Sequence, residues 1–290
     1  MRTRTLVTDA GDVTIREWGD ETAPRDRVLV ALHSMGPVST GALFNCAVRP
    51  LVEAGYHVVA PDLPGYGLTA ALPAQEYDVA RLADRVWTWV DALDAGRVTL
   101  VGHSWGGAIA MHMQARSPGA LDALVLVDSG HVDYADVNGA DAELSLADWV
   151  QRARDRRLVV PDRAALAEAI EVAADDPLMD DLMLGMVEED GRLAPRVTAE
   201  AQGAALFHLG RSKQTETWPA LQEEGTRTLL LLATEPREAL ELNRRAGHAF
   251  QAVVHQAEVQ LLEGATHSLV TDLRVAFGRL VAEWLASTGT

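Results

Sequence analysis

Residues 98–107 read VTLVGHSWGG, and this stretch decides the fold. Its first four residues favour a buried strand, and residues 108–116, which follow it, favour a helix. Between them lies the pattern G-x-S-x-G, in which Gly102 and Gly106 flank Ser104. A turn of this kind holds the serine at a strained backbone position and lifts its hydroxyl clear of the sheet, so both flanking residues must be small. The stretch therefore predicts that Ser104 is a nucleophile.

The same turn gives Trp105 a role through its backbone. Its N–H lies at the start of the helix, where the first N–H groups have no partner inside the helix and the helix dipole favours negative charge. Such an N–H stabilises the oxyanion that forms when a serine attacks a carbonyl group. The alternative interpretation of the motif, taken alone, is an ordinary glycine-rich turn between a strand and a helix.

With a strand before it and a helix after it, the motif resembles the nucleophile elbow of the α/β-hydrolase family, and the resemblance extends over nearly the whole chain. It implies an α/β fold with a mostly parallel sheet of eight strands, helices on both faces and a helical cap inserted after the sixth strand. The β-branched runs vanish after residue 131, and a strand-like apolar stretch resumes the sheet at residues 227–233. We therefore expect residues 1–131 and 219–290 to form the core domain and residues 132–218 to form the cap.

Alternating strand-like and helix-like stretches agree with this architecture. The expected strands are residues 4–8, 13–18, 27–32, 56–61, 98–101, 121–127, 227–233 and 258–262. The helices expected in the cap are residues 146–157, 163–174, 177–188 and 198–209. Those expected in the core include residues 44–54, interrupted near Pro50, and residues 78–94, 108–116 and 238–250. Residues 62–69, DLPGYGLT, resemble a turn of the family that shapes the loop beside the site, which implies a structural role for Asp62.

The loop after the third strand is expected to supply a second oxyanion donor. Members of the family usually carry His-Gly-x at this place, and this chain has His33, Ser34 and Met35. The resemblance implies that the N–H of Met35 is the donor and that His33 lines the loop. The serine in place of glycine is a departure, because its Cβ restricts the backbone. The alternative interpretation is a simple loop after a buried strand.

A serine nucleophile needs a base within hydrogen-bond reach. Among the nine histidines, His267 has the context that the family gives its catalytic histidine, because it follows the last strand in the sequence Gly-Ala-Thr-His. The chain order serine, acid, histidine is also the order of this family. His103 is adjacent to the nucleophile in sequence, and its side chain should point away from Ser104.

Two positions in the sequence are candidates for the acid that orients the catalytic histidine. In most of the family it follows the seventh strand, where this chain reads ATEPRE at residues 233–238 and has no aspartate. Glu235, or Glu238, serves if that loop shifts. The alternative, which we favour, is Asp128 directly after the sixth strand, a position used by some haloalkane dehalogenases and by zearalenone-type lactone hydrolases. Many relatives, however, carry a non-catalytic aspartate there.

The amino-acid composition limits the kinds of partner that the protein can bind. The net charge is −17 and Lys213 is the only lysine, which argues against nucleic acid or an anionic membrane surface as a partner. The N-terminus lacks the apolar run of a signal peptide, and no run of about 18 apolar residues is present to span a membrane. We expect a cytoplasmic protein and leave a homodimer open. Cys46 is the only cysteine, so it forms no internal disulfide, and we expect a buried structural thiol.

The expected function is that of a serine hydrolase that cleaves a carboxylic ester or lactone of an apolar small molecule through an acyl-enzyme, without a metal or an organic cofactor. A serine nucleophile excludes the chemistry of relatives that form an alkyl-ester intermediate on aspartate. Two alternatives stay open: a small-molecule receptor of the same fold, and a C–C bond hydrolase or lyase that uses the same triad. The residues expected to bind substrate are His33, Ser34, His103, Trp149, Met183 and Trp218.

Overall fold

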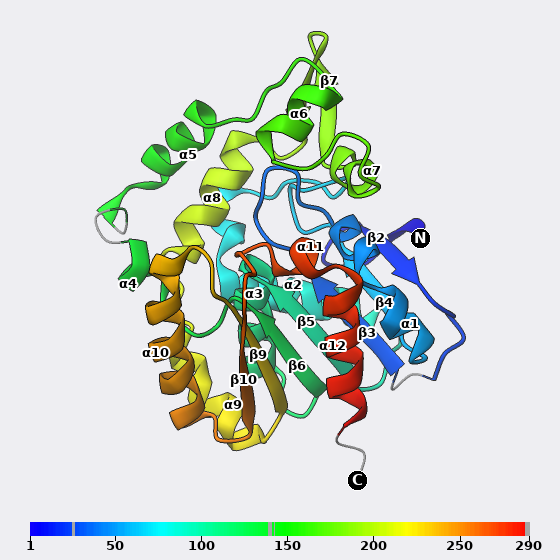
Figure 1. The fold of residues 1–290 in the computed structure, drawn as a ribbon, viewed down its shortest axis with the longest axis vertical. Coiled ribbons are helices and arrows are strands. Elements are labelled where there is room, and N and C mark those ends of the chain that lie inside the picture. The colour runs from blue at the N-terminus through cyan, green and yellow to red at the C-terminus, as the bar shows by residue number, and fades with distance from the viewer. Residues whose placement is uncertain (25–26, 139–140, 142, 288–290) are drawn as a thin grey trace.

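The computed structural model describes residues 1–24, 27–138, 141 and 143–287. The strands of its main sheet are β1 (Arg2–Leu6), β2 (Val13–Trp18), β3 (Val28–Leu32), β4 (His57–Pro61), β5 (Val98–His103), β6 (Leu121–Val127), β9 (Arg227–Ala233) and β10 (Ala257–Leu262). Their order is β1-β2-β4-β3-β5-β6-β9-β10, which places β5 near the middle of the sheet (Figure 1). β2 pairs antiparallel with β1 and β4, and the other neighbouring pairs are parallel. The predicted mostly parallel sheet of eight strands is confirmed.

Helices cover both faces of this sheet. They are η2 (Gly41–Cys46), α1 (Arg49–Glu53), η3 (Ala74–Tyr77), α2 (Val79–Asp91), α3 (Trp105–Arg116), α9 (Trp218–Glu224), α10 (Arg237–Val253), α11 (Leu269–Leu273) and α12 (Val275–Ala286). In β3, Val30 and Leu32 pack in one apolar cluster with α2 and α3, whereas Leu29 and Ala31 pack in a second cluster with α1 and α12. Because successive strand residues face opposite sides, a sheet covered on both faces needs the continuous apolar runs that the sequence shows.

Between β6 and α9 the chain forms a separate group of short elements, which we call the insert (residues 132–217). It contains α4 (Tyr134–Asn138), α5 (Leu146–Asp155), α6 (Arg163–Ala169), α7 (Leu178–Met183), β7 (Met186–Glu189), β8 (Arg192–Pro195), α8 (Ala199–Leu209) and η5 (Thr215–Thr217). In Figure 1 most of these elements lie above the main sheet, on the side of α11. The role of the insert as a cap, and the domain boundaries given above, stay predictions.

The insert differs from the prediction in one element. The helix predicted at residues 177–188 ends at Met183, and a hairpin of β7 and β8 follows in antiparallel pairing. The turn between the two strands holds Asp190 at φ 51° and Gly191 at φ 73°, the left-handed pair that two-residue hairpin turns require. The Asp-Gly dipeptide was therefore a readable hairpin signal in the sequence, and the helical interpretation of its surroundings was wrong.

One other predicted helix is shorter than expected, because the stretch 163–174 is helical only to Ala169. The interruption predicted in the stretch 44–54 is present: the stretch divides into η2 and α1, with Pro50 in the first turn of α1. Proline is tolerated there because the first N–H groups of a helix have no partner inside the helix.

In the described ranges, no helix is both long enough and apolar enough to cross a lipid bilayer.

Candidate active site

The elbow has the strained geometry that its sequence predicts. Ser104, between β5 and α3, has φ 53° and ψ −115°, a conformation that residues with a Cβ rarely adopt. A Cβ on Gly102 would lie 2.5 Å from the Cα of Gly107, and a Cβ on Gly106 would lie 2.2 Å from the carbonyl oxygen of Leu32. Both neighbours are backbone atoms that cannot move aside without disturbing the sheet. The need for small residues on both sides of Ser104 is thus confirmed.

The structure brings Ser104, His267 and Asp128 into one hydrogen-bonded line. The Nε2 atom of His267 lies 2.8 Å from Ser104 Oγ, and its Nδ1 atom lies 2.6 Å from Asp128 Oδ2. Asp128 directly follows β6 and His267 follows β10, so all three residues stand at the carboxyl ends of parallel strands. Because the carboxylate only accepts hydrogen bonds, Nδ1 carries the imidazole proton and Nε2 is free to accept from the serine.

A second set of bonds fixes the other oxygen of the Asp128 carboxylate. Its Oδ1 accepts the N–H of Ala233 at 3.0 Å and the side-chain amide of Asn243, on α10, at 3.3 Å. Burial acts to raise the pKa of Asp128, but the bonds from His267 and Ala233 outweigh it, and the pKa of this carboxyl is lowered. The carboxylate is therefore charged at neutral pH, and hydrogen bonds to both of its oxygens fix its orientation.

Glu235, the alternative acid, lies apart from this line. Its side chain is exposed, and its backbone N–H donates to the carbonyl of Ala265 at 3.0 Å. Since Nδ1 of His267 bonds to Asp128, the imidazole has no free nitrogen for a second acid. The arrangement favours Asp128, as the sequence interpretation did.

The two proposed oxyanion donors come from different segments, the residue that follows Ser104 and the loop after β3. Trp105 is the first residue of α3, so its N–H has no partner within the helix. Met35 lies in the loop after β3, and its carbonyl accepts a hydrogen bond from Tyr66 at 3.4 Å. His33 fixes the start of this loop, because its Nδ1 bonds to the carbonyl of Ser34 at 2.7 Å and its Nε2 accepts the N–H of Leu63 at 2.9 Å. The oxyanion role of Met35 stays a prediction.

The side chain of His103 holds the backbone of His267 in place. Its Nε2 lies 2.6 Å from the carbonyl oxygen of His267, to which it donates a hydrogen bond, and the two imidazole rings are 5.4 Å apart between centroids. Burial lowers the pKa of His103 to about 4 and that of His33 to about 4. Both side chains are therefore neutral at pH 7, and both hold loop backbone in place.

These two buried histidines predict a loss of stability in mild acid. A histidine with a folded-state pKa near 4 takes up its proton near pH 6.5 only when the chain unfolds. The unfolded state then binds more protons, so stability is present above pH 6.5 and is lost as the pH falls toward 4. We expect the free energy of unfolding to fall by at least about 2 kcal/mol between pH 6 and pH 5, measured by urea titration. His33→Asn should flatten this slope, and an equally steep slope in that variant would contradict the assignment.

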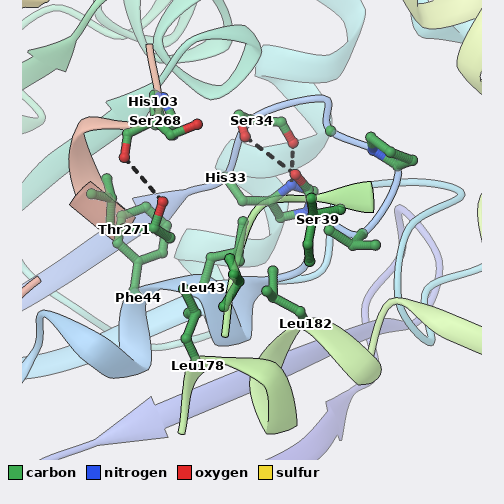
Figure 2. A pocket seen from close by; sticks show the side chains of 16 residues that line it. His33, Ser34, Ser39, Leu43, Phe44, His103, Leu178, Leu182, Ser268 and Thr271 are labelled. Carbon is green, nitrogen blue, oxygen red and sulfur yellow. Dashed lines mark hydrogen bonds between the residues drawn. The ribbon is translucent and has the colours of Figure 1, made fainter. Parts of the chain in front are cut away.

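A cavity of about 230 Å³ is lined by sequence neighbours of the triad and not by the triad residues themselves. His103 and Ser268, which line it, are the direct sequence neighbours of Ser104 and His267. The remaining walls come from the loop after β3, from η2, from α11 and from the insert. Figure 2 shows the hydroxyl pair Ser34 and Ser39 on one side and Ser268 with Thr271 on the other, above the apolar side chains of η2 and α7. The labelled apolar side chains are Leu43, Phe44, Leu178 and Leu182.

Half of the residues expected to bind substrate line this cavity. His33, Ser34 and His103 do so, whereas three large side chains of residues 132–218 do not. Trp149, on α5, is buried under the packing of α5 on α8; Met183 packs in the apolar cluster around α6 and α7; and Trp218 donates from Nε1 to the carbonyl of Gly130 at 2.8 Å. These three bury apolar surface inside the insert or anchor α9 to the core, so this cavity gives no support to the prediction that they bind substrate.

Cys46 behaves as a structural thiol. Its Sγ lies 3.2 Å from the carbonyl of Leu43, and burial raises the pKa of the Cys46 thiol to about 12. A thiol with such a pKa stays protonated at neutral pH and is a poor nucleophile.

Sequence reasoning missed Asn243, which contacts the triad directly, and Tyr134, which contacts Ser129 beside it. Asn243 contacts Asp128 across 115 residues of chain, and no local pattern marks it. Tyr134, at the start of α4, has its hydroxyl 3.5 Å from Ser129 Oγ, and Ser129 in turn donates to the carbonyl of Ser104 at 2.6 Å. The only signal for Tyr134 was its place a few residues after the sixth strand, next to the favoured acid.

Comparisons with known proteins agree with this geometry. A family model described as the alpha/beta hydrolase fold matches residues 27–165. An uncharacterized protein of Mycobacterium bovis is 26% identical over 273 residues, which cover 90% of this chain and 75% of that protein. A 2-hydroxy-6-oxononadienedioate/2-hydroxy-6-oxononatrienedioate hydrolase of Cupriavidus pinatubonensis is 36% identical over 129 residues, 44% of each chain. Among solved structures, an esterase from Exiguobacterium antarcticum gives a TM-score of 0.71 at 17% identity, covering 99% of this chain and 100% of its own.

Proposed function

We propose that the chain, which has the α/β-hydrolase fold, is a hydrolase that cleaves an uncharged carboxylic ester or lactone through an acyl-enzyme on Ser104. The observation that carries this proposal is the line of hydrogen bonds from Ser104 through His267 to Asp128, with lengths of 2.8 and 2.6 Å. A serine hydroxyl is a weak nucleophile at neutral pH and is activated by an adjacent base that a third group orients. Here the imidazole is both within reach of the serine and held in the correct tautomer.

The proposed reaction has two halves. His267 takes the proton of Ser104 while Oγ attacks the carbonyl carbon, and the N–H groups of Met35 and Trp105 bind the resulting oxyanion. One such donor typically lowers the barrier by about 3 kcal/mol. The protonated imidazole then donates to the leaving alcohol. In the second half, His267 activates a water molecule, which cleaves the acyl-enzyme and releases the acid.

The cavity walls favour an uncharged substrate. Among the described residues that line the cavity there is no arginine, lysine, aspartate or glutamate, and the two histidines are neutral at pH 7. The polar groups are hydroxyls, of which Ser34 and Ser39 bond to each other and Thr271 bonds to the carbonyl of Ser268. A carboxylate placed here would lose its water without gaining a cationic partner, which costs several kcal/mol. Neutral acyl or alcohol groups fit these walls better.

Hydrolysis of a C–C bond by the same three residues is the second candidate, and the relative from Cupriavidus pinatubonensis favours it. That relative's name describes a dioate, a substrate with two carboxylates. The absence of a cationic side chain from the cavity lining argues that a dioate is not the substrate of this chain. The receptor alternative differs from both candidates because it requires no sustained turnover.

The test is labelling with a fluorophosphonate probe, mapped by mass spectrometry, in the wild type and in Ser104→Ala. We expect one adduct on Ser104 and none in the variant, because only an activated serine reacts with the probe. The wild type should then turn over p-nitrophenyl butyrate many times, and should hydrolyse the charged mono-p-nitrophenyl succinate at least about tenfold more slowly, since the cavity offers no cation.

An unlabelled wild type that is folded by circular dichroism would refute the acyl-enzyme. Labelling followed by a single turnover would favour the receptor. Faster hydrolysis of the charged ester would refute the assignment of an uncharged substrate, while leaving the acyl-enzyme in place.

A further inference from the structure

Two buried polar side chains continue the hydrogen bonds of the triad beyond Asp128, through the carboxylate oxygen that does not face His267. His131 follows Asp128 by three residues and is 5% exposed, and Asn243, on α10, is 6% exposed. Nε2 of His131 lies 3.1 Å from Oδ1 of Asn243, whose Nδ2 lies 3.3 Å from Oδ1 of Asp128. Burying polar side chains is costly unless hydrogen bonds replace the lost water, and here those bonds lead to the triad.

The orientation of the Asn243 amide follows from the atoms around it. Nδ2 lies 3.0 Å from the carbonyl oxygen of Ala233 and 3.3 Å from Oδ1 of Asp128, and both of these oxygens only accept hydrogen bonds. The amide NH₂ group must therefore face them, and the amide oxygen faces His131. Because that oxygen is an acceptor, Nε2 of His131 carries a proton and donates it. Burial lowers the pKa of His131, so the ring is neutral at pH 7 with its one proton on Nε2.

The backbone of Asp128 also has to be held by its surroundings. Its φ is 46°, in the left-handed region that residues with a Cβ rarely adopt. Strain of this kind persists only where neighbouring structure fixes the residue. Two helices do so here: Trp218 of α9 donates from Nε1 to the carbonyl of Gly130 at 2.8 Å, and Asn243 of α10 bonds to Asp128. The loop after β6 is thus held from both helices where it presents the acid.

We propose that His131 and Asn243 are positioning residues that act in series on the triad acid. His131 fixes the amide of Asn243. The amide in turn holds the Asp128 carboxylate, so that its Oδ2 stays 2.6 Å from Nδ1 of His267. The inference rests on the proposed function, because an effect on rate requires that the triad performs the chemistry. Neither side chain lines the cavity, so both should affect the chemical steps and not substrate binding.

The expected effect on rate follows from what remains when the amide is removed. Oδ1 of Asp128 would keep one donor, the N–H of Ala233 at 3.0 Å. A single bond allows the carboxylate to rotate about its Cβ–Cγ bond, which turns Oδ2 away from His267. Acylation and deacylation both depend on Oδ2, because it holds the imidazole tautomer and stabilises the imidazolium. Loss of positioning should therefore lower kcat and leave KM unchanged.

The experiment measures kcat and KM for p-nitrophenyl butyrate in His131→Leu, in Asn243→Leu and in the double variant. Asn243→Leu removes a hydrogen bond to a charged group, so we expect kcat to fall between about tenfold and a hundredfold. His131→Leu removes a bond between neutral groups, so kcat should fall about threefold to tenfold. If His131 acts through Asn243, kcat of the double variant should be no lower than that of Asn243→Leu alone.

Two control variants separate the loss of a donor from the loss of packing. His57→Leu removes another buried histidine, which is 8% exposed and lies at the start of β4, whereas the triad lies at the ends of strands. Its Nε2 is 3.3 Å from Glu17, so we expect kcat to stay at the wild-type value. His131→Gln keeps an N–H group near the place of Nε2, so it should restore kcat to within about twofold of the wild type.

A second measurement needs no turnover. The proton between Nδ1 of His267 and Asp128 lies in a charge-assisted bond of 2.6 Å, and protons in such short bonds resonate far downfield in proton NMR. We expect this resonance in the wild type, and we expect it to move upfield in Asn243→Leu as the bond lengthens. Asp128→Asn removes the carboxylate acceptor, so loss of the resonance in that variant assigns it.

Three results would each overturn the inference: additive falls of kcat in the double variant, a fall in His131→Leu no larger than in His57→Leu, or an unchanged resonance in Asn243→Leu. Equal falls in His131→Leu and His131→Gln would do so too, because the donor would then not matter. If His131→Leu does not fold, kcat and the resonance of Asn243→Leu still decide. If the wild type takes no fluorophosphonate on Ser104, the proposed function fails, while the resonance still tests how Asp128 is held.

Discussion

Replacing Asp128 with asparagine should lower kcat/KM by about 10⁴-fold, while Glu235→Gln should leave it nearly unchanged. The loss expected in Asp128→Asn is large because hydrogen bonds already fix one oxygen of the Asp128 carboxylate. Its Oδ1 accepts from Ala233 and from Asn243, so the carbonyl oxygen of an asparagine would have to stay on that side. The new amide group would then face His267.

That amide can only donate, so it would force Nδ1 of His267 to accept. The imidazole proton would move to Nε2, and Nε2 could no longer take the proton of Ser104. The imidazolium would also lose the negative charge that stabilises it. The variant should keep its fold, because asparagine has nearly the same shape and retains the bonds to Ala233 and Asn243.

Steady-state kinetics on a neutral p-nitrophenyl ester would measure both variants side by side. Glu235 is the matched control, because it is the other candidate acid and its side chain is exposed. Equal and mild losses in the two variants would mean that neither carboxylate orients His267. A larger loss in Glu235→Gln would mean that the loop after β9 moves to the site in solution.

The choice between Asp128 and Glu235 as the triad acid shows what can and cannot be predicted from the sequence. Ser104 and His267 could be assigned because their signals are local: small residues around a turn, and a histidine after the last strand. The acid could not be settled by local pattern, because either loop can approach the histidine. The decision depends on where Ala233 and Asn243 place their donors, and Asn243 lies 115 residues beyond Asp128.

The residues that line the cavity could not be predicted from local sequence pattern either. Large apolar residues of the insert were natural candidates for substrate contacts, yet Trp149 and Trp218 bury their rings in packing, and smaller side chains line the space. Which face of a short helix meets the core and which meets a cavity depends on how helices from distant segments cross. A sequence shows that a helix has an apolar face, but it does not show what covers that face.

The second large effect concerns stability, and it involves Arg16 and Asp62. Their side chains are 2% and 0% exposed and are joined by bonds of 3.2 and 3.0 Å. Asp62 also accepts the N–H of Gly41 at 2.9 Å and that of Leu68 at 3.1 Å, so it ties β2 and the loop after β4 to η2. This confirms the structural role that the turn sequence implied.

Asp62→Asn should lower the free energy of unfolding by about 3–5 kcal/mol, because it leaves the Arg16 guanidinium buried without a compensating charge. Asp122→Asn is the control: it breaks the pair of Arg97 and Asp122, which has a similar distance of 3.2 Å but side chains that are 58% and 37% exposed. Water already solvates that pair, so the control should cost no more than about 1 kcal/mol. Urea titration at one pH measures both variants.

The double variant Arg16→Met with Asp62→Asn separates the two causes of the loss. If the cost comes from an unpaired buried charge, removing that charge should restore part of the stability lost in Asp62→Asn. If the cost comes from the contacts of Asp62 with Gly41 and Leu68, the double variant should be no more stable than the single one. A loss in Asp62→Asn no larger than that of Asp122→Asn would contradict the burial argument itself. Since η2 carries Leu43 and Phe44 of the cavity wall, the same substitution should also raise KM for neutral esters.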